Sequence, residues 1–162
     1  MIVVVMGVSG AGKSVLGSRL AERLGCRFID ADEHHPPQNV TKMASGTPLS
    51  DEDRWPWLDK LNALLRQETH AVLACSALKE AYRVRLTAGI SRYRIVFLRG
   101  DIGLIRSRLK SRQHRYMPAS LLDSQFAALE PPAQAIEIDV SADPEACVGS
   151  ILSALGAFKR AR

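Results

Sequence analysis

The sequence predicts an α/β protein in which helices cover both faces of a five-stranded parallel sheet. Short apolar segments rich in β-branched residues alternate along the chain with segments whose apolar residues recur every three or four positions. Segments of the first kind are typical of buried parallel strands, and segments of the second kind are typical of helices. With 162 residues, 46% of them hydrophobic, the chain is expected to form a single domain over residues 1–162.

The first elements are the clearest. Ile2–Met6 is an apolar, β-branched run and is predicted to be a buried strand. In residues 14–24 the leucines recur every four positions and so share one helical face, and Gly25 is a typical helix stop. Arg27–Asp30 is predicted to be the second strand.

The alternation continues to the end of the chain. Ser50 and Asp53 have the spacing of a capping box, which predicts the start of a leucine-bearing helix. Asp143, which precedes a proline, predicts the start of the C-terminal helix. Two more helices are expected around Tyr82–Leu86 and Ile102–Leu109. The remaining strands are predicted at residues 71–75, 93–98 and 135–140.

Two segments do not fit this alternation. Residues 32–51 are polar and contain prolines, and we expect them to form part of a substrate wall. Residues 113–132 carry three prolines around a short helical pattern, and we expect a lid that closes over bound nucleotide. Ligands of open parallel sheets bind beyond the carboxyl ends of the strands, so the chemistry is expected just after each strand.

Composition restricts the class of protein. The formal net charge of +5 suits anionic ligands, but the basic residues are spread along the chain and do not predict nucleic-acid binding. The three cysteines are isolated, which favours neither a disulfide framework nor a zinc site. The N-terminal apolar run is too short for a signal peptide or a membrane span, so we expect a cytoplasmic protein without membrane association.

The strongest motif lies directly after the first strand. Residues 7–14 read GVSGAGKS and match the phosphate-binding P-loop, in which glycines let backbone N–H groups approach phosphate oxygens. The helix that follows adds its positive end. We expect Lys13 to reach the β- and γ-phosphates of ATP and Ser14 to hold Mg²⁺. The expected nucleotide contacts are Gly7, Val8, Ser9, Gly10, Ala11, Gly12, Lys13 and Ser14.

A pair of acids ends the second strand. Asp30 and Asp32 point to opposite faces if the chain stays extended, so one can face Mg²⁺ while the other faces an acceptor hydroxyl. Capping of a turn is an equally good interpretation of these two residues taken alone.

With these residues in view, the sequence resembles the small P-loop gluconate kinases, which are relatives of shikimate kinase. The resemblance covers nearly the whole chain and implies a three-layer P-loop kinase fold with a lid. It also implies ATP-dependent phosphorylation of the terminal hydroxyl of D-gluconate, giving 6-phospho-D-gluconate and ADP. Besides the loop and the acid pair, it rests on His35-Pro36, Asn39, Lys42-Met43, residues 46–54, Pro56-Trp57-Leu58, residues 75–79, Tyr82-Arg83, Met117-Pro118, residues 124–126 and Leu129-Glu130.

Gluconate is a carboxylate with a run of hydroxyls, and several side chains suit it. Arginine offers a planar fork for a carboxylate, so Arg54 and Arg83 are the candidates, with a surface ion pair as the alternative for each. The side chains expected to hydrogen-bond the polyol are His35, Ser76, Lys79 and Gln125.

The resemblance also suggests catalytic roles. Together with Lys13, Arg112 is assigned to the transferring phosphate and Arg108 to the nucleotide side. Asp30 is our choice for holding a metal-bound water. Asp32 is our choice for orienting the 6-hydroxyl and accepting its proton, and the reverse assignment stays open.

The sequence departs from the family pattern at residues 114–116, which read His-Arg-Tyr where a Gly-His-Phe-like triplet is usual, and this leaves the effect on the lid open. Thr87 stands where an arginine is frequent. Three alternatives have different functions: a kinase for shikimate or another small molecule, a non-catalytic nucleotide-binding regulator, and a GTPase, which the absence of an N-K-x-D motif disfavours. Related kinases also suggest a homodimer.

Overall fold

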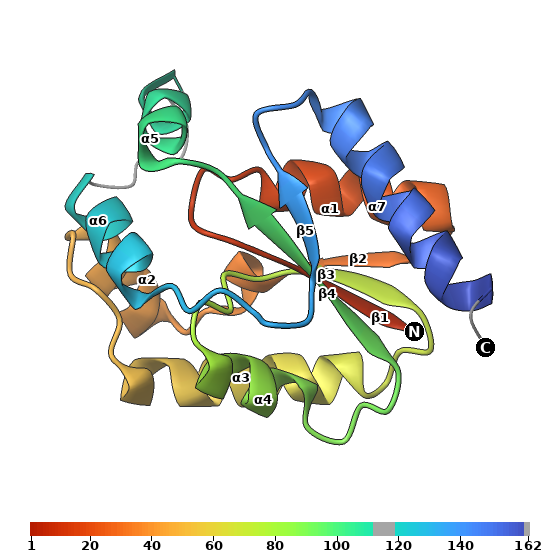
Figure 1. The fold of residues 1–162 in the computed structure, drawn as a ribbon. Coiled ribbons are helices and arrows are strands. Elements are labelled where there is room, and N and C mark those ends of the chain that lie inside the picture. Colours follow the sequence, from red (N-terminus) through yellow and green to blue (C-terminus); the bar gives the residue numbers. More distant parts are fainter. Residues whose placement is uncertain (112–118, 161–162) are drawn as a thin grey trace.

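Five parallel strands form the sheet in this computed structural model, which describes residues 1–111 and 119–160 (Figure 1). The strand order is β2-β3-β1-β4-β5. The prediction of a parallel five-stranded sheet is confirmed, and the predicted strand bounds differ from the observed ones by at most one residue at either end. The strands are β1 (Ile2–Met6), β2 (Arg27–Asp30), β3 (Ala71–Ala74), β4 (Tyr93–Arg99) and β5 (Ile136–Asp139).

Helices lie on both faces of the sheet, which gives the expected three layers. Helices α1 and α7 pack together on one face, and α3 and α4 pack together on the other (Figure 1). The helical elements are α1 (Lys13–Leu24), the short 3₁₀ helix η1 (Ala31–His34), α2 (Pro37–Ala44), α3 (Asp51–Leu65), α4 (Glu80–Thr87), α5 (Ile102–Ser111), α6 (Ala119–Ala128) and α7 (Pro144–Arg160).

The central strand β1 contributes to both halves of the core. Val3 and Val5 belong to the cluster beneath α1 and α7, whereas Ile2, Val4 and Met6 belong to the cluster beneath α3 and α4. Successive side chains of a strand point to opposite faces, so a strand covered on both sides must be apolar at every position. This explains why the N-terminal run shows no polar alternation.

The segment 32–51 is more regular than the sequence indicates. It contains η1 and α2, and α2 has Pro37 at its first helical position, where a proline is well tolerated. The only buried residue of α2 is Asn39, so no apolar periodicity marks this helix in the sequence. Of the predicted lid, residues 119–132 include α6, while residues 112–118 lie outside the described part of the chain.

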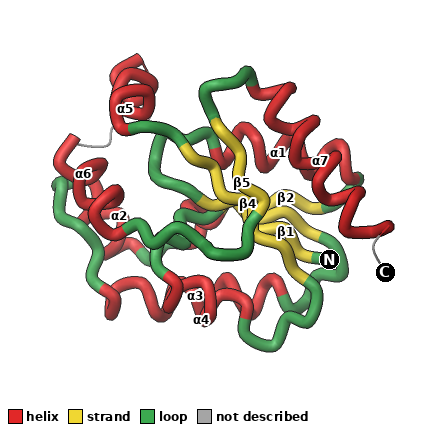
Figure 2. Tube along the Cα trace, in the orientation of Figure 1, coloured by secondary structure: helices red, strands yellow, loops and turns green. Residues whose placement is uncertain are grey.

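Parallel pairing aligns the ends of three strands. Val5 of β1 and Asp30 of β2 are both in register with Ala74 of β3, and Cys75 N–H continues the ladder by donating to Val5 O at 3.0 Å. The loops that leave these strands therefore start at one edge of the sheet, the edge that faces α2, α5 and α6 (Figure 2). Within the described residues, no helix has the length and apolar character needed to cross a membrane.

The start of α3 gives a prediction about stability. Ser50 Oγ accepts from Asp53 N–H at 3.1 Å, and Asp53 Oδ2 accepts from Ser50 N–H at 2.9 Å and from Lys42 Nζ at 2.8 Å. The hydrogen bond from Lys42, followed by that from Ser50, lowers the pKa of Asp53 from 3.8 to about 2. Because the unfolded chain then binds more protons, this stabilisation is present above pH 3.8 and is lost as the pH falls toward 2.

We therefore expect Asp53→Asn to lower the melting temperature at pH 7 and to flatten its decline between pH 4 and pH 2, measured by thermal unfolding followed by circular dichroism. Glu145→Gln, which removes exposed ion pairs with Arg19 and Arg23, is the control and should leave the profile nearly unchanged. An Asp53→Asn profile as steep as that of the parent protein would contradict this account.

Candidate active site

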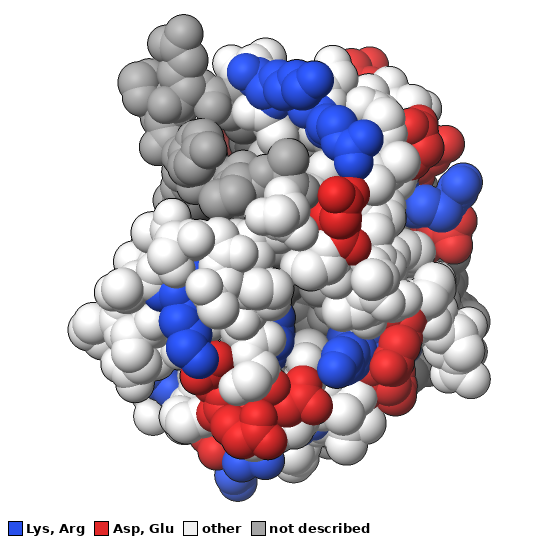
Figure 3. All heavy atoms as spheres, turned by 90° about the vertical axis from the view of Figure 1, so that its left-hand side faces the viewer, with Lys and Arg blue, Asp and Glu red and all other residues white. Residues whose placement is uncertain are grey.

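A cleft of about 430 Å³ opens at the edge of the sheet where β1, β2 and β3 end. Its walls come from the P-loop, from the segment after β2, from α3 and from α6. On the side of the molecule viewed in Figure 3, Lys and Arg side chains are interspersed with Asp and Glu, so individual residues rather than one basic patch determine what binds. The predicted site residues that line this cleft are Ser9, Gly10, Gly12, Lys13, Ser14, Asp32, His35, Arg54, Ser76 and Gln125.

The P-loop adopts a backbone that favours glycine. Gly10 and Gly12 have φ angles of +83° and +96°, in the left-handed region that side chains rarely adopt. Gly12 caps α1 without a side-chain hydrogen bond, and the first turn of α1 contains no acidic residue. A helix N-terminus of this kind favours an anion, because its N–H groups and its dipole both point toward negative charge.

Lys13 and Ser14 begin α1 beneath this loop. Lys13 Nζ donates to Val8 O at 3.0 Å, which holds the lysine side chain back along the loop. Ser14 Oγ donates to Asp30 Oδ2 at 2.7 Å, which joins the P-loop helix to the end of β2. A hydroxyl and a carboxylate are hard oxygen donors of the kind that Mg²⁺ prefers, and Mg²⁺ commonly takes only one or two ligands from the protein. The two residues therefore fit a magnesium ion.

Of the two interpretations of Asp30 and Asp32, an extended chain and the capping of a turn, the structure shows the second for Asp30. After Asp30 the chain turns into η1, and Asp30 Oδ1 caps this turn by accepting from Asp32 N–H at 3.0 Å. Asp30 is buried, with one oxygen directed at the turn and the other at Ser14. The Asp32 side chain is 57% exposed and lies in the cleft wall. The turn thus leaves Asp30 buried and Asp32 exposed, instead of placing them on opposite faces of an extended strand.

His35 lies deep in the same wall, with a side chain only 4% exposed. Its ring stacks on Trp57 with centroids 4.0 Å apart. Burial lowers the pKa of His35, with a smaller lowering by Arg54, and the neighbouring carboxylate of Asp32 raises it in part. The imidazole is therefore neutral at pH 7, and its pKa falls further from physiological pH than that of an exposed histidine.

Arg54 and Lys79 bring positive charge to one end of the cleft. Arg54 Nη1 donates to the carbonyl oxygens of Leu49 and Ser50, and its guanidinium lies 5.1 Å from the ring centroid of Tyr82. Lys79 lies just beyond, 3.4 Å from Asp51 Oδ1, in a smaller hollow of about 340 Å³ that shares Arg54 and Gln125 with the cleft.

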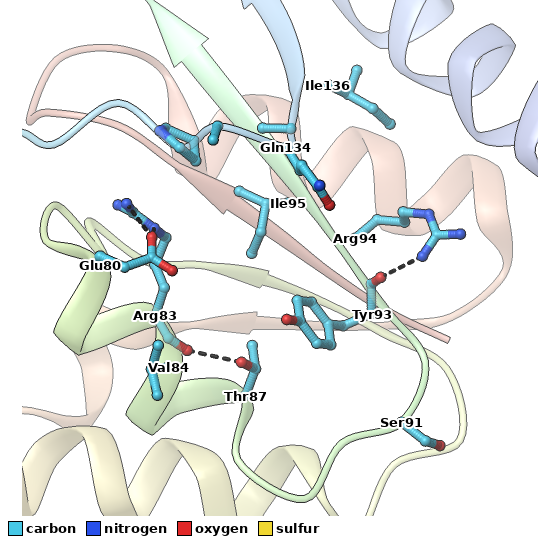
Figure 4. Close-up of a pocket in the computed structure, with 13 residues that line it drawn as sticks. Glu80, Arg83, Val84, Thr87, Ser91, Tyr93, Arg94, Ile95, Gln134 and Ile136 are labelled. Carbon is cyan, nitrogen blue, oxygen red and sulfur yellow. Dashed lines mark hydrogen bonds and ion pairs between the residues drawn. The ribbon is translucent and has the colours of Figure 1, made fainter.

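Arg83 is not brought into the cleft. Its buried guanidinium donates to the carbonyl oxygens of Ala77 and Leu78 at 2.9 and 3.1 Å and to Glu80 at 2.7 Å. Ala77 has a φ angle of +43°, so these bonds support a loop in an unfavourable conformation. Arg83 lines a separate hollow of about 970 Å³ between α4, β4 and the segment before β5, where Figure 4 shows it beside Glu80.

Gln125 connects α6 to the P-loop. Its Oε1 accepts from Ser9 N–H at 2.8 Å, and its Nε2 donates to Ser9 Oγ at 3.2 Å. An amide oxygen here occupies a loop N–H of the kind that P-loops offer to phosphate oxygens. The expected lid segment is therefore in direct contact with the nucleotide loop.

Arg108 lines a further hollow of about 270 Å³, on the side of the P-loop away from the cleft, where its Nη2 donates to Val140 O. Ala11 and Gly12 also line this hollow, so it adjoins the P-loop. Arg112 lies outside the described residues, and its assignment stays a prediction.

Two further residues shape the site: Trp57, for which the sequence favours a packing role, and Asn39, to which it gives no role. Trp57 carries the His35 ring, and Asn39 contacts the same ring from α2. Both belong to the segments that carry the family resemblance, but residue type and spacing alone do not reveal a contact between a helix after β2 and the middle of α3.

The P-loop, the acid-bearing turn after β2 and the cleft between them define a P-loop kinase that acts on a small molecule. Similarity to known proteins supports this class of protein. A family model described as "AAA domain" matches residues 2–132. A probable gluconokinase of Xenopus tropicalis is 44% identical, covering 93% of this chain and 91% of its own, and the thermosensitive gluconokinase of Escherichia coli K12 is 45% identical, covering 85% and 75%.

The crystal structure of a gluconokinase from Sinorhizobium meliloti 1021 superposes with a TM-score of 0.89 at 39% identity, covering 96% of this chain and 91% of that one. The chain belongs to the gluconokinase family, and the resemblance and the fold class predicted from the sequence are confirmed.

The P-loop backbone gives a prediction with a matched control. A Cβ on Gly10 would meet Leu109 Cγ at 2.9 Å in addition to its left-handed φ angle, whereas a Cβ on Gly149 in α7 would meet nothing within 4 Å. We expect Gly10→Ala to lower the free energy of unfolding by about 1–2 kcal/mol and to weaken ATP binding. Gly149→Ala should raise the free energy of unfolding by about 0.5–1 kcal/mol.

Urea denaturation and calorimetric titration with ATP measure both quantities. A Gly10→Ala variant that binds ATP as tightly as the parent protein would show that the loop conformation is not needed for nucleotide binding.

Proposed function

We propose that the protein transfers the γ-phosphoryl group of ATP to the terminal hydroxyl of D-gluconate, giving 6-phospho-D-gluconate and ADP. The observation that carries this proposal is the meeting of the P-loop and the Asp32–His35 turn in one cleft, in a chain of the gluconokinase family. Phosphoryl transfer needs positioning and charge neutralisation more than covalent chemistry, and this cleft offers both.

The P-loop binds the phosphates of ATP. The uncapped N-terminus of α1 and the glycine backbone hold the phosphate oxygens, and Lys13 exchanges its contact with Val8 O for the β- and γ-phosphates. The hollow beside Arg108 receives the base and ribose, since it adjoins the P-loop on the side away from the acceptor cleft. Arg112 is assigned to the transferring phosphate on the resemblance alone.

Ser14 and Asp30 would hold magnesium, Ser14 through its hydroxyl and Asp30 through a water. When bound, magnesium neutralises charge on the phosphates. The burial of Asp30 and its bond to Ser14 favour this assignment over the reverse one, because Oδ2 of Asp30 is held against the P-loop helix while Oδ1 caps the turn.

Asp32 orients the acceptor hydroxyl and takes its proton. It is the acid of the pair whose side chain lies in the cleft wall, and its carboxylate is the acceptor that an attacking alcohol requires. Ser76 and Gln125 line the same cleft and hydrogen-bond other hydroxyls of gluconate, and His35 hydrogen-bonds a hydroxyl beside Asp32.

Arg54 and Lys79 attract the carboxylate of gluconate at the far end of the cleft. Asp51, beside Lys79, accepts a hydrogen bond from the hydroxyl of Tyr82. The hydrogen bonds from Tyr82 and then from Lys79 lower the pKa of Asp51. Lys79 and Asp51 are therefore both charged and held in place. Arg83 is reassigned from substrate binding to support of the loop that carries Ser76. A homodimer and a cytoplasmic location stay predictions.

The proposed roles of Asp32 and Lys13 separate in kinetics. Asp32→Asn keeps the shape of the cleft but removes the proton acceptor, so we expect kcat to fall by about 10²- to 10³-fold with little change in KM for gluconate. Lys13→Ala should lower kcat/KM by at least ~10²-fold. Asp59→Asn, an exposed carboxylate paired with Arg85 on the outer side of α3, is the matched control and should keep the parent rate.

These rates are measured by coupled ADP release. A near-normal kcat for Asp32→Asn would remove Asp32 from the base role and return the assignment to Asp30.

The acceptor itself is tested by ADP release with gluconate, shikimate, other aldonates and AMP in parallel. We expect gluconate to give the highest kcat/KM. Turnover with shikimate or AMP and none with gluconate would overturn the substrate assignment. ATP binding with no turnover on any acceptor would instead support a nucleotide-binding regulator.

A further inference from the structure

Asn39 is a buried polar residue whose orientation the structure determines. It is fully buried in α2, and its Nδ2 donates to the backbone oxygen of Asp53 at 2.9 Å. A carbonyl oxygen only accepts hydrogen bonds, so the side-chain atom that faces it must be the amide nitrogen. The same nitrogen lies 3.3 Å from Nδ1 of His35, on the element before it.

This contact determines the tautomer of His35. The amide nitrogen has no lone pair to offer, so Nδ1 of the imidazole must accept from it and cannot carry a proton. The neutral ring therefore carries its proton on Nε2. Trp57 fixes the ring plane by stacking at an interplanar angle of 16°, and Trp57 is itself held by a hydrogen bond of 2.8 Å from its Nε1 to Ala31 O.

The Nε2–H of His35 faces Asp32 across a gap in the cleft wall. The distance from Nε2 to Asp32 Oδ1 is 4.0 Å, too long for a direct hydrogen bond. A hydroxyl oxygen placed beside this pair, within hydrogen-bond distance of both atoms, accepts from Nε2–H and donates its own proton to the carboxylate. The hydroxyl of an alcohol satisfies both partners at once, as a water molecule would in its place, because each is both a donor and an acceptor.

The side chain of Asn39 is kept at a cost to the fold. Within the described residues its Oδ1 is buried without a hydrogen-bond partner, which destabilises the folded state. An apolar side chain at this position would avoid that cost but would lose the two donated hydrogen bonds. Because only the Nδ2 of the Asn39 side chain makes hydrogen bonds within the described residues, we infer that the site requires its N–H donors and not its oxygen.

We propose that Asn39 is a positioning residue that fixes His35 in the Nε2–H tautomer, so that His35 and Asp32 together hold one hydroxyl of the acceptor. The proposal rests on the proposed function for the identity of that acceptor, but the tautomer of His35 is independent of it. The other tautomer would turn a lone pair toward the carboxylate of Asp32, and no single hydroxyl would then be held as donor and acceptor at the same time.

The tautomer is read directly by long-range ¹H–¹⁵N correlation spectra of the uniformly labelled protein at pH 7.5, with His35 assigned by comparison with His35→Phe. We expect the Nε2-protonated pattern in the parent protein and its loss or mixing in Asn39→Leu. A parent spectrum with the proton on Nδ1 would overturn the proposal, whatever the protein phosphorylates.

Kinetics test the coupling to substrate. We expect Asn39→Leu to raise KM for gluconate about tenfold, with KM for ATP unchanged, because one hydroxyl contact is lost. In the His35→Phe background the same change should have no further effect on KM, because Asn39 acts through His35. Additive effects of the two changes would mean that Asn39 acts by another route and would overturn the proposal.

Asn62→Leu is the matched control. Asn62 in α3 also donates from its amide to two backbone oxygens, those of Leu86 and Ala88, but it lies away from the cleft. Asn62→Leu should lower the melting temperature and leave KM for gluconate unchanged. Should the parent protein show the expected tautomer without phosphorylating gluconate, the proposed function fails while the assignment of Asn39 stands.

Discussion

The site depends on the in-register parallel pairing of β1, β3 and β2. Val5, Ala74 and Asp30 lie side by side at the carboxyl edge, so the P-loop, the loop before α4 and the turn after β2 all leave the sheet at the same level. A slip of one residue in β2 would turn Asp30 away from Ser14, because neighbouring strand residues face opposite sides. The apolar core beneath both faces fixes that register and with it the distance between phosphate and acceptor.

The hydrogen bond from Ser14 to Asp30 places the two acids of this segment differently, and the proposed roles follow from that placement. It holds Asp30 against the P-loop, while η1 carries Asp32 into the cleft and His35 onto Trp57. In the proposed function, residues 30–35 therefore supply a carboxylate for the metal, a carboxylate for the acceptor proton and an imidazole for a hydroxyl. The cleft walls that complete the acceptor site come from α3 and α6, which are far away in sequence.

The fold and the P-loop could be predicted from the sequence because their signals are local: apolar runs, leucine spacing, Gly25 as a stop and the capping box of Ser50 and Asp53. Long-range contacts could not. Helix α2 buries only Asn39 and so shows no periodicity, and the turn after Asp30 depends on a carboxylate that caps it. Arg83 looked like a carboxylate ligand by residue type, but its place on α4 directs it to Ala77 and Leu78.

The central claim is that the P-loop and Asp32 bring a triphosphate and the terminal hydroxyl of gluconate together in this cleft. A crystal structure with a non-hydrolysable ATP analogue, Mg²⁺ and gluconate tests it most directly. The account predicts the terminal hydroxyl oxygen within about 3.5 Å of the γ-phosphorus and in contact with Asp32. Gluconate bound with its carboxylate toward the γ-phosphate, or Asp32 directed out of the cleft, would contradict it.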